Sequence, residues 1–220
     1  MNKKVAVILS GCGVYDGSEI HESVITLLRL DQRGAEVHCF APNMEQLHVV
    51  DHYSGDEMDE TRNVLVESAR IARGKIKDVR ELHADDFDAL IMPGGFGAAK
   101  NLTDFALSGA NLKVQPDVLN AAKSFASAGK PVGLICISPV LAARIFGNGV
   151  ECTIGSDHDT AAALTQMGAV HRECEVSEIV EDPARKLVTT PAYMLAQSIS
   201  QAASGINKLV DRVLELTHHD

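Results

Sequence analysis

The sequence of 220 residues has no tryptophan, and aromatic residues make up only 4% of it. A platform of aromatic side chains that stacks on nucleic-acid bases is therefore not expected. The formal net charge of −10 also disfavours binding to nucleic acid or to an anionic membrane surface. No stretch reaches the roughly 18 consecutive apolar residues that a membrane-spanning helix needs. We therefore expect neither nucleic acid nor a membrane among the partners.

The cysteines are too few and too scattered to form a disulfide framework or a structural zinc site. There are five, an odd number, and no two are spaced as a C-x-x-C pair. The run Asp157-His158-Asp159 offers three potential metal ligands, but three consecutive residues rarely converge on one ion. Asp157 is more simply interpreted as a helix cap. We expect no metal and no organic cofactor.

Neither a nucleotide site nor a targeting segment is predicted near the amino terminus. Gly11 and Gly13 begin a dinucleotide-binding pattern, but Asp16 stands where the third glycine belongs. The apolar run of residues 5–9 after two lysines is too short for the core of a signal peptide, and it is better interpreted as a first strand. We therefore expect a cytoplasmic protein, and the 45% apolar content can supply the core of one domain, residues 1–220.

Strand and helix patterns alternate along the chain. Short apolar or β-branched runs predict strands over residues 4–10, 36–41, 88–92, 131–135 and 151–155, and a hairpin over 175–180 and 187–190. Apolar periodicity and caps predict helices over 18–33, 57–73, 117–128, 160–167 and 194–216. This alternation indicates an α/β fold with a mostly parallel sheet. In the first helix Val24, Leu27 and Leu28 mark the expected core face, with Ser18 as the expected cap.

The segment around Cys136 is the strongest candidate for chemistry. A buried-strand pattern ends at Ile135, Ser138 is a good helix cap, and Pro139 suits the first helical position. The cysteine would then lie on a sharp turn between strand and helix, where the helix dipole lowers the pKa of a thiol. The alternative is a small buried hydrophobic residue, since the glycines that usually flank such a turn are missing.

Loops that follow parallel strands lie on the same rim of the sheet, so three segments should converge with the cysteine. Glu19 and Glu22 are candidate acids in the first turn of a helix, although a glutamate there also simply complements the helix dipole. Beside a thiolate in a dry pocket, burial would raise the pKa of Glu22. The backbone N–H groups of Gly94, Gly95 and Ile137 are candidate oxyanion donors. The alternative for the glycines is a simple turn after a strand.

Two histidines follow strands that end at the same rim. His21 lies in the first loop, and His158 lies in the loop after residues 151–155. Either could reach the site, but each is also typical of a solvated loop, and neither is adjacent to Cys136 in sequence.

These segments resemble the class I glutamine-amidotransferase-like superfamily, which includes PfpI proteases and the cofactor-free deglycase and glyoxalase III proteins. The resemblance covers nearly the whole chain and is carried by residues 5–10, 22–34, 88–97 and 133–136. It implies a flavodoxin-like three-layer sandwich and a homodimer. Cys136 matches the nucleophile, Glu22 matches the glutamate that hydrogen-bonds it, and Gly95 and Ile137 match the oxyanion donors.

One departure from the superfamily narrows the function. Several branches place a histidine directly after the cysteine, where this chain has Ile137, which disfavours amidase and peptidase activity. His158 lies near the position of a site histidine in a deglycase branch. The resemblance is strongest to a branch described in connection with isoprenoid biosynthesis and assigned a glyoxalase activity.

The resulting hypothesis is a glutathione-independent glyoxalase. It would convert glyoxal or methylglyoxal to glycolate or lactate through a hemithioacetal on Cys136, and such turnover can also reflect deglycase action. The alternatives are a redox-sensing or partner-binding module that uses the same cysteine, and an amidotransferase-like subunit that hydrolyses an amide.

Overall fold

A sheet of seven strands forms the centre of the structure, a computed structural model that describes residues 2–218. The strand order is β10-β11-β7-β6-β1-β2-β5, and every neighbouring pair is parallel except β10 with β11. The bounds are β1 Lys4–Ile8, β2 Glu36–Ala41, β5 Ile76–Asp78, β6 Ala89–Met92, β7 Val132–Ile135, β10 Val180–Asp182 and β11 Leu187–Thr190. The expected α/β fold with a mostly parallel sheet is confirmed.

The central strands are apolar on both sides, as a parallel sheet covered by helices requires. In β1, Val5 and Val7 contribute to one hydrophobic core, and Ala6 and Ile8 contribute to the other. Successive side chains of a strand point to opposite faces, so an uninterrupted apolar run supplies both cores at once.

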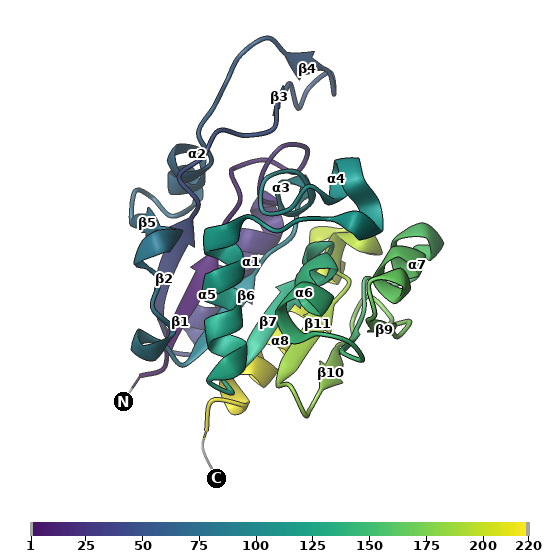
Figure 1. The fold of residues 1–220 in the computed structure, drawn as a ribbon. Coiled ribbons are helices and arrows are strands. Elements are labelled where there is room, and N and C mark those ends of the chain that lie inside the picture. Colours follow the sequence, from purple (N-terminus) through teal and green to yellow (C-terminus); the bar gives the residue numbers. More distant parts are fainter. Residues whose placement is uncertain (1, 219–220) are drawn as a thin grey trace.

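Helices cover both faces of this sheet (Figure 1). On one face lie α1 (Ile20–Gln32), α2 (Val64–Ile71) and α8 (Ile199–Glu215), and on the other lie α5 (Pro116–Ser127) and α6 (Ala142–Phe146). Arg29 of α1 and Asp211 of α8 form a two-pronged ion pair, with N–O distances of 2.9 and 2.6 Å. None of the helices among residues 2–218 is long and apolar enough to cross a membrane.

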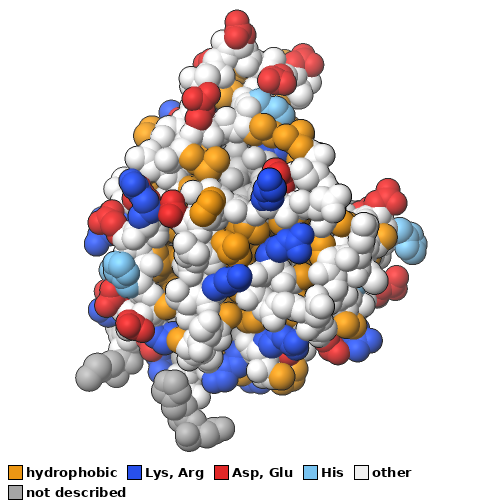
Figure 2. Space-filling model, viewed as in Figure 1, with side chains coloured by type: hydrophobic (Ala, Val, Ile, Leu, Met, Phe, Trp, Pro, Cys, Tyr) orange, Lys and Arg blue, Asp and Glu red, His pale blue; other side chains and the backbone are white. Residues whose placement is uncertain are grey.

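Shorter elements lie outside the central sheet. These are α3 (Phe96–Lys100), α4 (Phe105–Ser108), α7 (His158–Gln166), a small parallel sheet of β8 (Glu151–Cys152) and β9 (Val170–His171), and five 3-10 turns at 79–81, 84–86, 109–111, 138–141 and 192–194. An arm formed by β3 (Val49–Val50) and β4 (Glu57–Met58) projects from the top in Figure 1. Figure 2 shows that acidic side chains gather on it.

Four predicted elements differ from those observed. The first strand of the hairpin expected over 175–180 and 187–190 is β10, Val180–Asp182, which pairs antiparallel with β11. The helix expected over 57–73 begins only at Val64, because Asn63 caps it by accepting from the N–H of Val66 at 3.0 Å. The strand expected over 151–155 is the short β8, outside the central sheet. The closing helix begins at Ile199, where the Ser198 hydroxyl accepts from the N–H of Gln201.

The buried face of α1 is not the one that its apolar residues predict. Val24 and Leu28 are 48% and 52% exposed, whereas Ser23 and Thr26 are fully buried. The two hydroxyls donate to the carbonyl four residues earlier, both at 2.7 Å, so they enter the core without an unpaired polar group. This rotation brings Glu22 onto the buried face and toward the rim of the sheet.

Candidate active site

Cys136 lies on a strained turn directly after β7, as the sequence predicts. Its φ of 64° is in the left-handed region, which costs a residue with a side chain about 1–3 kcal/mol. The N–H of Cys136 donates to the carbonyl of Thr190 at the end of the neighbouring β11, 2.9 Å away. This pairing holds the thiol at the carboxyl rim of the sheet, with only 7% of the residue exposed.

Ser138 does not cap a helix, contrary to the sequence prediction. The chain continues as a 3-10 turn over Ser138–Leu141 before the five residues of α6. The Ser138 hydroxyl instead donates to the carbonyl of Pro93 at 2.7 Å. It therefore ties the cysteine turn to the glycine loop that follows β6.

Glu22 is fully buried beside the thiol. Its Oε1 accepts from the N–H of Gly94 at 2.9 Å, its Oε2 accepts from the N–H of Tyr193 at 3.2 Å, and the carboxyl is hydrogen-bonded to Cys136. Burial, together with the nearby charge of Glu19, raises the pKa of Glu22 to about 8. The prediction of a glutamate in a dry pocket with a raised pKa is confirmed.

The expected lowering of the pKa of Cys136 is wrong. Burial raises it well above the ordinary value of 9.0, and the charge of Glu22 and its hydrogen bond add to that effect. Hydrogen bonds from the N–H groups of Gly95 and Ile137 act in the opposite direction but do not prevail. Because two adjacent anions are unfavourable in so dry a place, the thiol and the carboxyl retain at least one proton between them near neutral pH.

The glycine loop has a different role at each of its first two residues. The N–H of Gly94 donates to Glu22, so it is not available as the oxyanion donor that the sequence suggests. The N–H groups that act on Cys136 belong to Gly95 and Ile137. A Cβ on Gly94 would lie 2.5 Å from the Cβ of Cys136. Gly95 has φ +96°, and a Cβ there would collide with the backbone of Gly17 and Glu19. Both positions therefore require glycine because the backbone approaches so closely.

Glu19 takes the capping role that the sequence suggests for Ser18. Its Oε2 accepts from the N–H of Glu22 at 2.6 Å, whereas Ser18 accepts from the N–H of Ser10. Burial raises the pKa of Glu19, although hydrogen bonds from the backbone oppose the change. Glu19 therefore fixes the first turn of α1 and so positions Glu22.

A cavity of about 370 Å³ opens beside the thiol. It is lined by Val14, Glu19, Gly95, Phe96, Ala99, Phe105, Ala106, Cys136, Ile137, Asp157, Thr160, Tyr193 and Met194. Most of the lining is apolar, and α3 and α4 supply much of it.

Tyr193 is a site residue that the sequence does not reveal; its backbone N–H holds Glu22, and the residue lines the cavity. It follows Ala192, which has a positive φ of 45°. The Tyr193 hydroxyl lies 2.6 Å from Nδ1 of His21. One signal was available, because this turn follows β11, next to β7, and so had to lie on the same rim.

The histidines do not contact the thiol directly. His158 is exposed at the start of α7 and does not line the cavity, and His21 reaches the cavity only through Tyr193. Asp157 caps α7 by accepting from the N–H of Thr160 at 2.9 Å, as predicted. Within residues 2–218, no three His, Cys, Asp or Glu side chains are grouped so that they could hold a metal ion.

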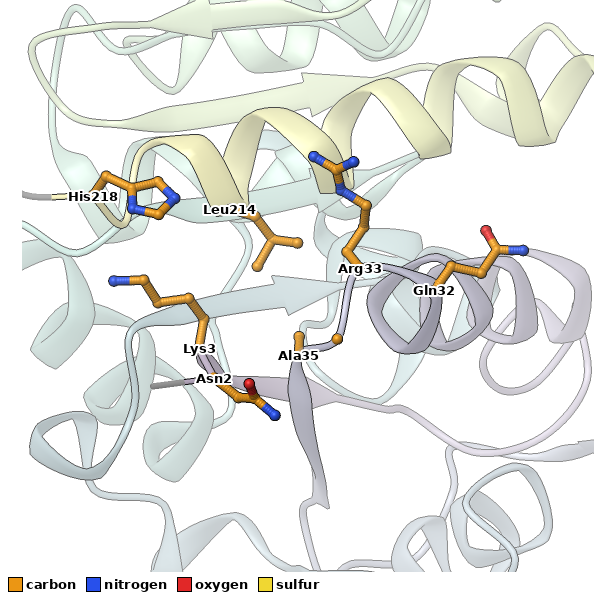
Figure 3. A pocket seen from close by; sticks show the side chains of 8 residues that line it. Asn2, Lys3, Gln32, Arg33, Ala35, Leu214 and His218 are labelled. Carbon is orange, nitrogen blue, oxygen red and sulfur yellow. The ribbon is translucent and has the colours of Figure 1, made fainter.

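A second cavity, of about 390 Å³, lies where α1 and α8 end (Figure 3). It is lined by Asn2, Lys3, Gln32, Arg33, Gly34, Ala35, Leu214 and His218. Lys3 donates to the carbonyl of Thr217, and Arg33 pairs with Asp211, so these cations already bind the ends of the helices. The lining has no cysteine, serine or threonine, and we take the cavity at Cys136 as the candidate site.

Comparison with known proteins identifies the family of this chain. The model of the DJ-1/PfpI family matches residues 3–192. The human glutamine amidotransferase-like class 1 domain-containing protein 3, mitochondrial, is 50% identical over 97% of this chain and 83% of its own length. The zebrafish ES1 protein, mitochondrial, is 35% identical over 98% of the chain and 87% of its own length.

A solved structure is also similar. The crystal structure of an isoprenoid biosynthesis protein with an amidotransferase-like domain from Ehrlichia chaffeensis has a TM-score of 0.89. It is 38% identical and covers 96% of this chain and 99% of its own.

The names of the two curated relatives contradict the expectation of a cytoplasmic protein, since both are described as mitochondrial. The expectation rested on the absence of a signal-peptide core. That absence argues only against the secretory route, because other targeting segments have a different composition.

Proposed function

The chain belongs to the DJ-1/PfpI family, and we propose that it is a glutathione-independent glyoxalase that converts glyoxal or methylglyoxal to the 2-hydroxy acid. The observation that carries this proposal is the buried carboxyl of Glu22 directly beside Cys136, which lines the cavity. A nucleophile and an acid–base group that can both take and return a proton near neutral pH are the two groups that this isomerisation requires.

The first step forms a bond between Sγ of Cys136 and the aldehyde carbon, C1. The thiol proton passes through the Glu22 carboxylate to the former carbonyl oxygen, which gives a neutral hemithioacetal. The N–H groups of Gly95 and Ile137 interact with the sulfur, and we propose that they stabilise this oxygen as it becomes negative.

In the second step the Glu22 carboxylate takes the hydrogen of C1. The electron pair forms a C1–C2 double bond, and water gives a proton to the oxygen on C2, which yields an enediol. Glu22 then returns its proton to C2, while the oxygen on C1 gives its proton back to water and becomes the carbonyl of a thioester. C1 is thereby oxidised and C2 reduced by two electrons, and no external oxidant is needed.

Water hydrolyses the thioester, so that Cys136 regains its proton and the hydroxy acid leaves. Glu22 is suited to these transfers because a pKa of about 8 lets it both hold and release a proton near neutral pH. Tyr193 lines the same cavity and its hydroxyl lies 2.6 Å from Nδ1 of His21, and we assign to this hydroxyl the hydrogen bond to the second substrate oxygen.

The test is turnover of glyoxal and methylglyoxal without glutathione, in a buffer free of amines and thiols so that deglycation of adducts does not contribute. We expect saturable turnover by the wild type and none by Cys136→Ala. Glu22→Gln should lower turnover by about 10²–10⁴-fold, the usual effect of losing a positioned acid–base group. Absent turnover, or equal turnover by Cys136→Ala, would refute the proposal.

The two alternatives have less support from the site. Hydrolysis of an amide needs a proton carrier for the leaving group, and none of the described residues that line the cavity is a histidine. A redox sensor needs an accessible thiolate, whereas Cys136 is buried and its pKa is raised. Mass spectrometry after peroxide treatment tests the redox alternative. That alternative requires that Cys136 is oxidised before Cys39 and Cys152.

We also propose that the chain forms a homodimer through α1. Ile20, Val24 and Leu28 are 42–52% exposed and lie four residues apart, so they form one apolar stripe on the outer face of this helix. Light scattering of the wild type and of Val24→Glu tests this proposal. A wild type that is monomeric at all concentrations would refute it.

A further inference from the structure

We infer that the preferred substrate is a 2-oxoaldehyde that carries a bulky, uncharged, apolar substituent, rather than glyoxal itself. This inference rests on the proposed function, because it concerns the same cavity and the same reaction at Cys136. Three features of the described residues carry it: the volume of the cavity, the chemistry of its wall and the sign of its charge.

The cavity is far larger than glyoxal. Glyoxal has four non-hydrogen atoms and takes up roughly the space of two or three water molecules, ~60–90 Å³ at about 30 Å³ for each water. The cavity measures about 370 Å³, which is within the range of pockets that bind ligands of drug size. Most of this space would stay unfilled with glyoxal or methylglyoxal bound to the thiol.

The polar and apolar groups of the lining are separated. Cys136, Gly95 and the Tyr193 hydroxyl supply the polar groups that a dicarbonyl needs. The wall beyond them consists of Val14, Phe96, Ala99, Phe105, Ala106 and Met194. A dicarbonyl bound at the thiol would therefore direct its substituent into an apolar space.

One aromatic side chain of this wall is incompletely covered. Phe96 is 47% exposed although it lies at the start of α3, beside the glycine loop. A substituent that packs on this ring removes apolar surface from water on both partners, which favours binding in proportion to the area covered.

The charge of the lining excludes an anionic substituent. Its ionisable side chains besides Cys136 and Tyr193 are the carboxyls of Glu19 and Asp157, and no lysine, arginine or histidine of the described part lines it. Lys100 lies over the Phe96 ring, but its ammonium group donates to the carbonyl of Tyr15 and to His48. A carboxylate or phosphate on the substituent would therefore find two like charges and no counter-ion.

The test compares kcat/KM for glyoxal, methylglyoxal, phenylglyoxal and 4-carboxyphenylglyoxal without glutathione. We expect phenylglyoxal to be used at least about tenfold better than glyoxal, as burial of an aromatic ring predicts. The added carboxylate should remove at least about tenfold of that advantage. Both comparisons use the wild type, so they do not depend on the folding of a variant.

A matched pair of variants tests whether the apolar wall is responsible. Ala106→Phe fills the cavity from α4, and it should lower kcat/KM for phenylglyoxal at least tenfold more than kcat/KM for glyoxal. Leu107→Phe adds a ring at the next residue, which is 73% exposed and does not line the cavity. It should change neither value.

The inference is overturned if phenylglyoxal is used no better than glyoxal, or if Ala106→Phe lowers both values equally. If glyoxal is still turned over in a Cys136-dependent manner, either result leaves the proposed function intact. If none of the four aldehydes is turned over in a Cys136-dependent manner, the proposed function and this inference both fail.

Discussion

Substitution of Glu22 by glutamine should remove a specific part of the pH dependence of stability. Glu22 is fully buried, and its pKa rises from 4.5 to about 8 in the folded protein. Between these two values the folded state binds more protons than the unfolded state, so the free energy of unfolding must fall as pH rises. Glutamine has nearly the same shape but does not titrate.

The size of the effect follows from the two pKa values. The stabilising contribution of the protonated carboxyl is complete below pH 4.5, falls by about 1.4 kcal/mol for each pH unit above it, and is gone above about pH 8. The whole interval corresponds to roughly 5 kcal/mol, which is a large fraction of the 5–15 kcal/mol that stabilises a typical domain. Even half of this value would be the largest part of the change with pH in the difference in unfolding free energy between the wild type and Glu22→Gln.

Urea denaturation at a series of pH values from 5 to 8 measures this pH dependence of the unfolding free energy. Wild-type stability should fall relative to Glu22→Gln by about 1.4 kcal/mol for each pH unit. The informative quantity is this slope, because the glutamine amide also faces the N–H of Gly94 or Tyr193 and lowers stability by a constant amount at every pH.

Glu45→Gln, at an exposed glutamate, is the control and should follow the wild type. If the wild type and Glu22→Gln give parallel curves from pH 5 to 8, Glu22 is already ionised, and the assignment of a protonated carboxyl beside the thiol is wrong.

Three further substitutions have expected outcomes. Gly94→Ala places a methyl group 2.5 Å from the Cβ of Cys136; it should lower unfolding free energy by about 1–3 kcal/mol and turnover by more than tenfold, and normal turnover would contradict the close approach. Tyr193→Phe removes the hydroxyl that lies 2.6 Å from His21 but keeps the N–H that holds Glu22; it should lower stability by about 1 kcal/mol and leave the pH slope unchanged, as urea titrations at two pH values would show. Arg29→Met breaks a partly exposed ion pair with Asp211; we expect a small loss of stability that shrinks in high salt, and a loss that does not shrink would show that packing rather than charge is responsible.

Much of the fold could be predicted because its signals are local in the chain. The apolar run after Lys4 and the run before Cys136 each indicate a buried strand, and both are confirmed as β1 and β7. Asp157 caps α7 because a side chain can reach an N–H three residues ahead in almost any context. The turn at Cys136 is also local, since it follows from an apolar strand that must stop before a proline.

The errors concern features that depend on distant neighbours. Apolar content predicts Val24 and Leu28 as the core face of α1, yet buried Ser23 and Thr26 face the core. The sequence also favours Ser138 as a helix cap, whereas its hydroxyl binds the carbonyl of Pro93, 45 residues away. Such choices depend on which partners the sheet brings together, and local periodicity does not contain that information.

The sequence by itself therefore determined most of the strands and helices, though not β5, together with the sharp turn at the cysteine and the glycine loop, because spacing, turn chemistry and caps act over a few residues. Only the tertiary structure decided the protonation of the Cys136–Glu22 pair, the presence of Tyr193 and the size of the cavity. The physical reason is that a pKa depends on burial and a cavity depends on packing. Both arise only when α1, β7, β11 and α3 meet at one rim of the sheet.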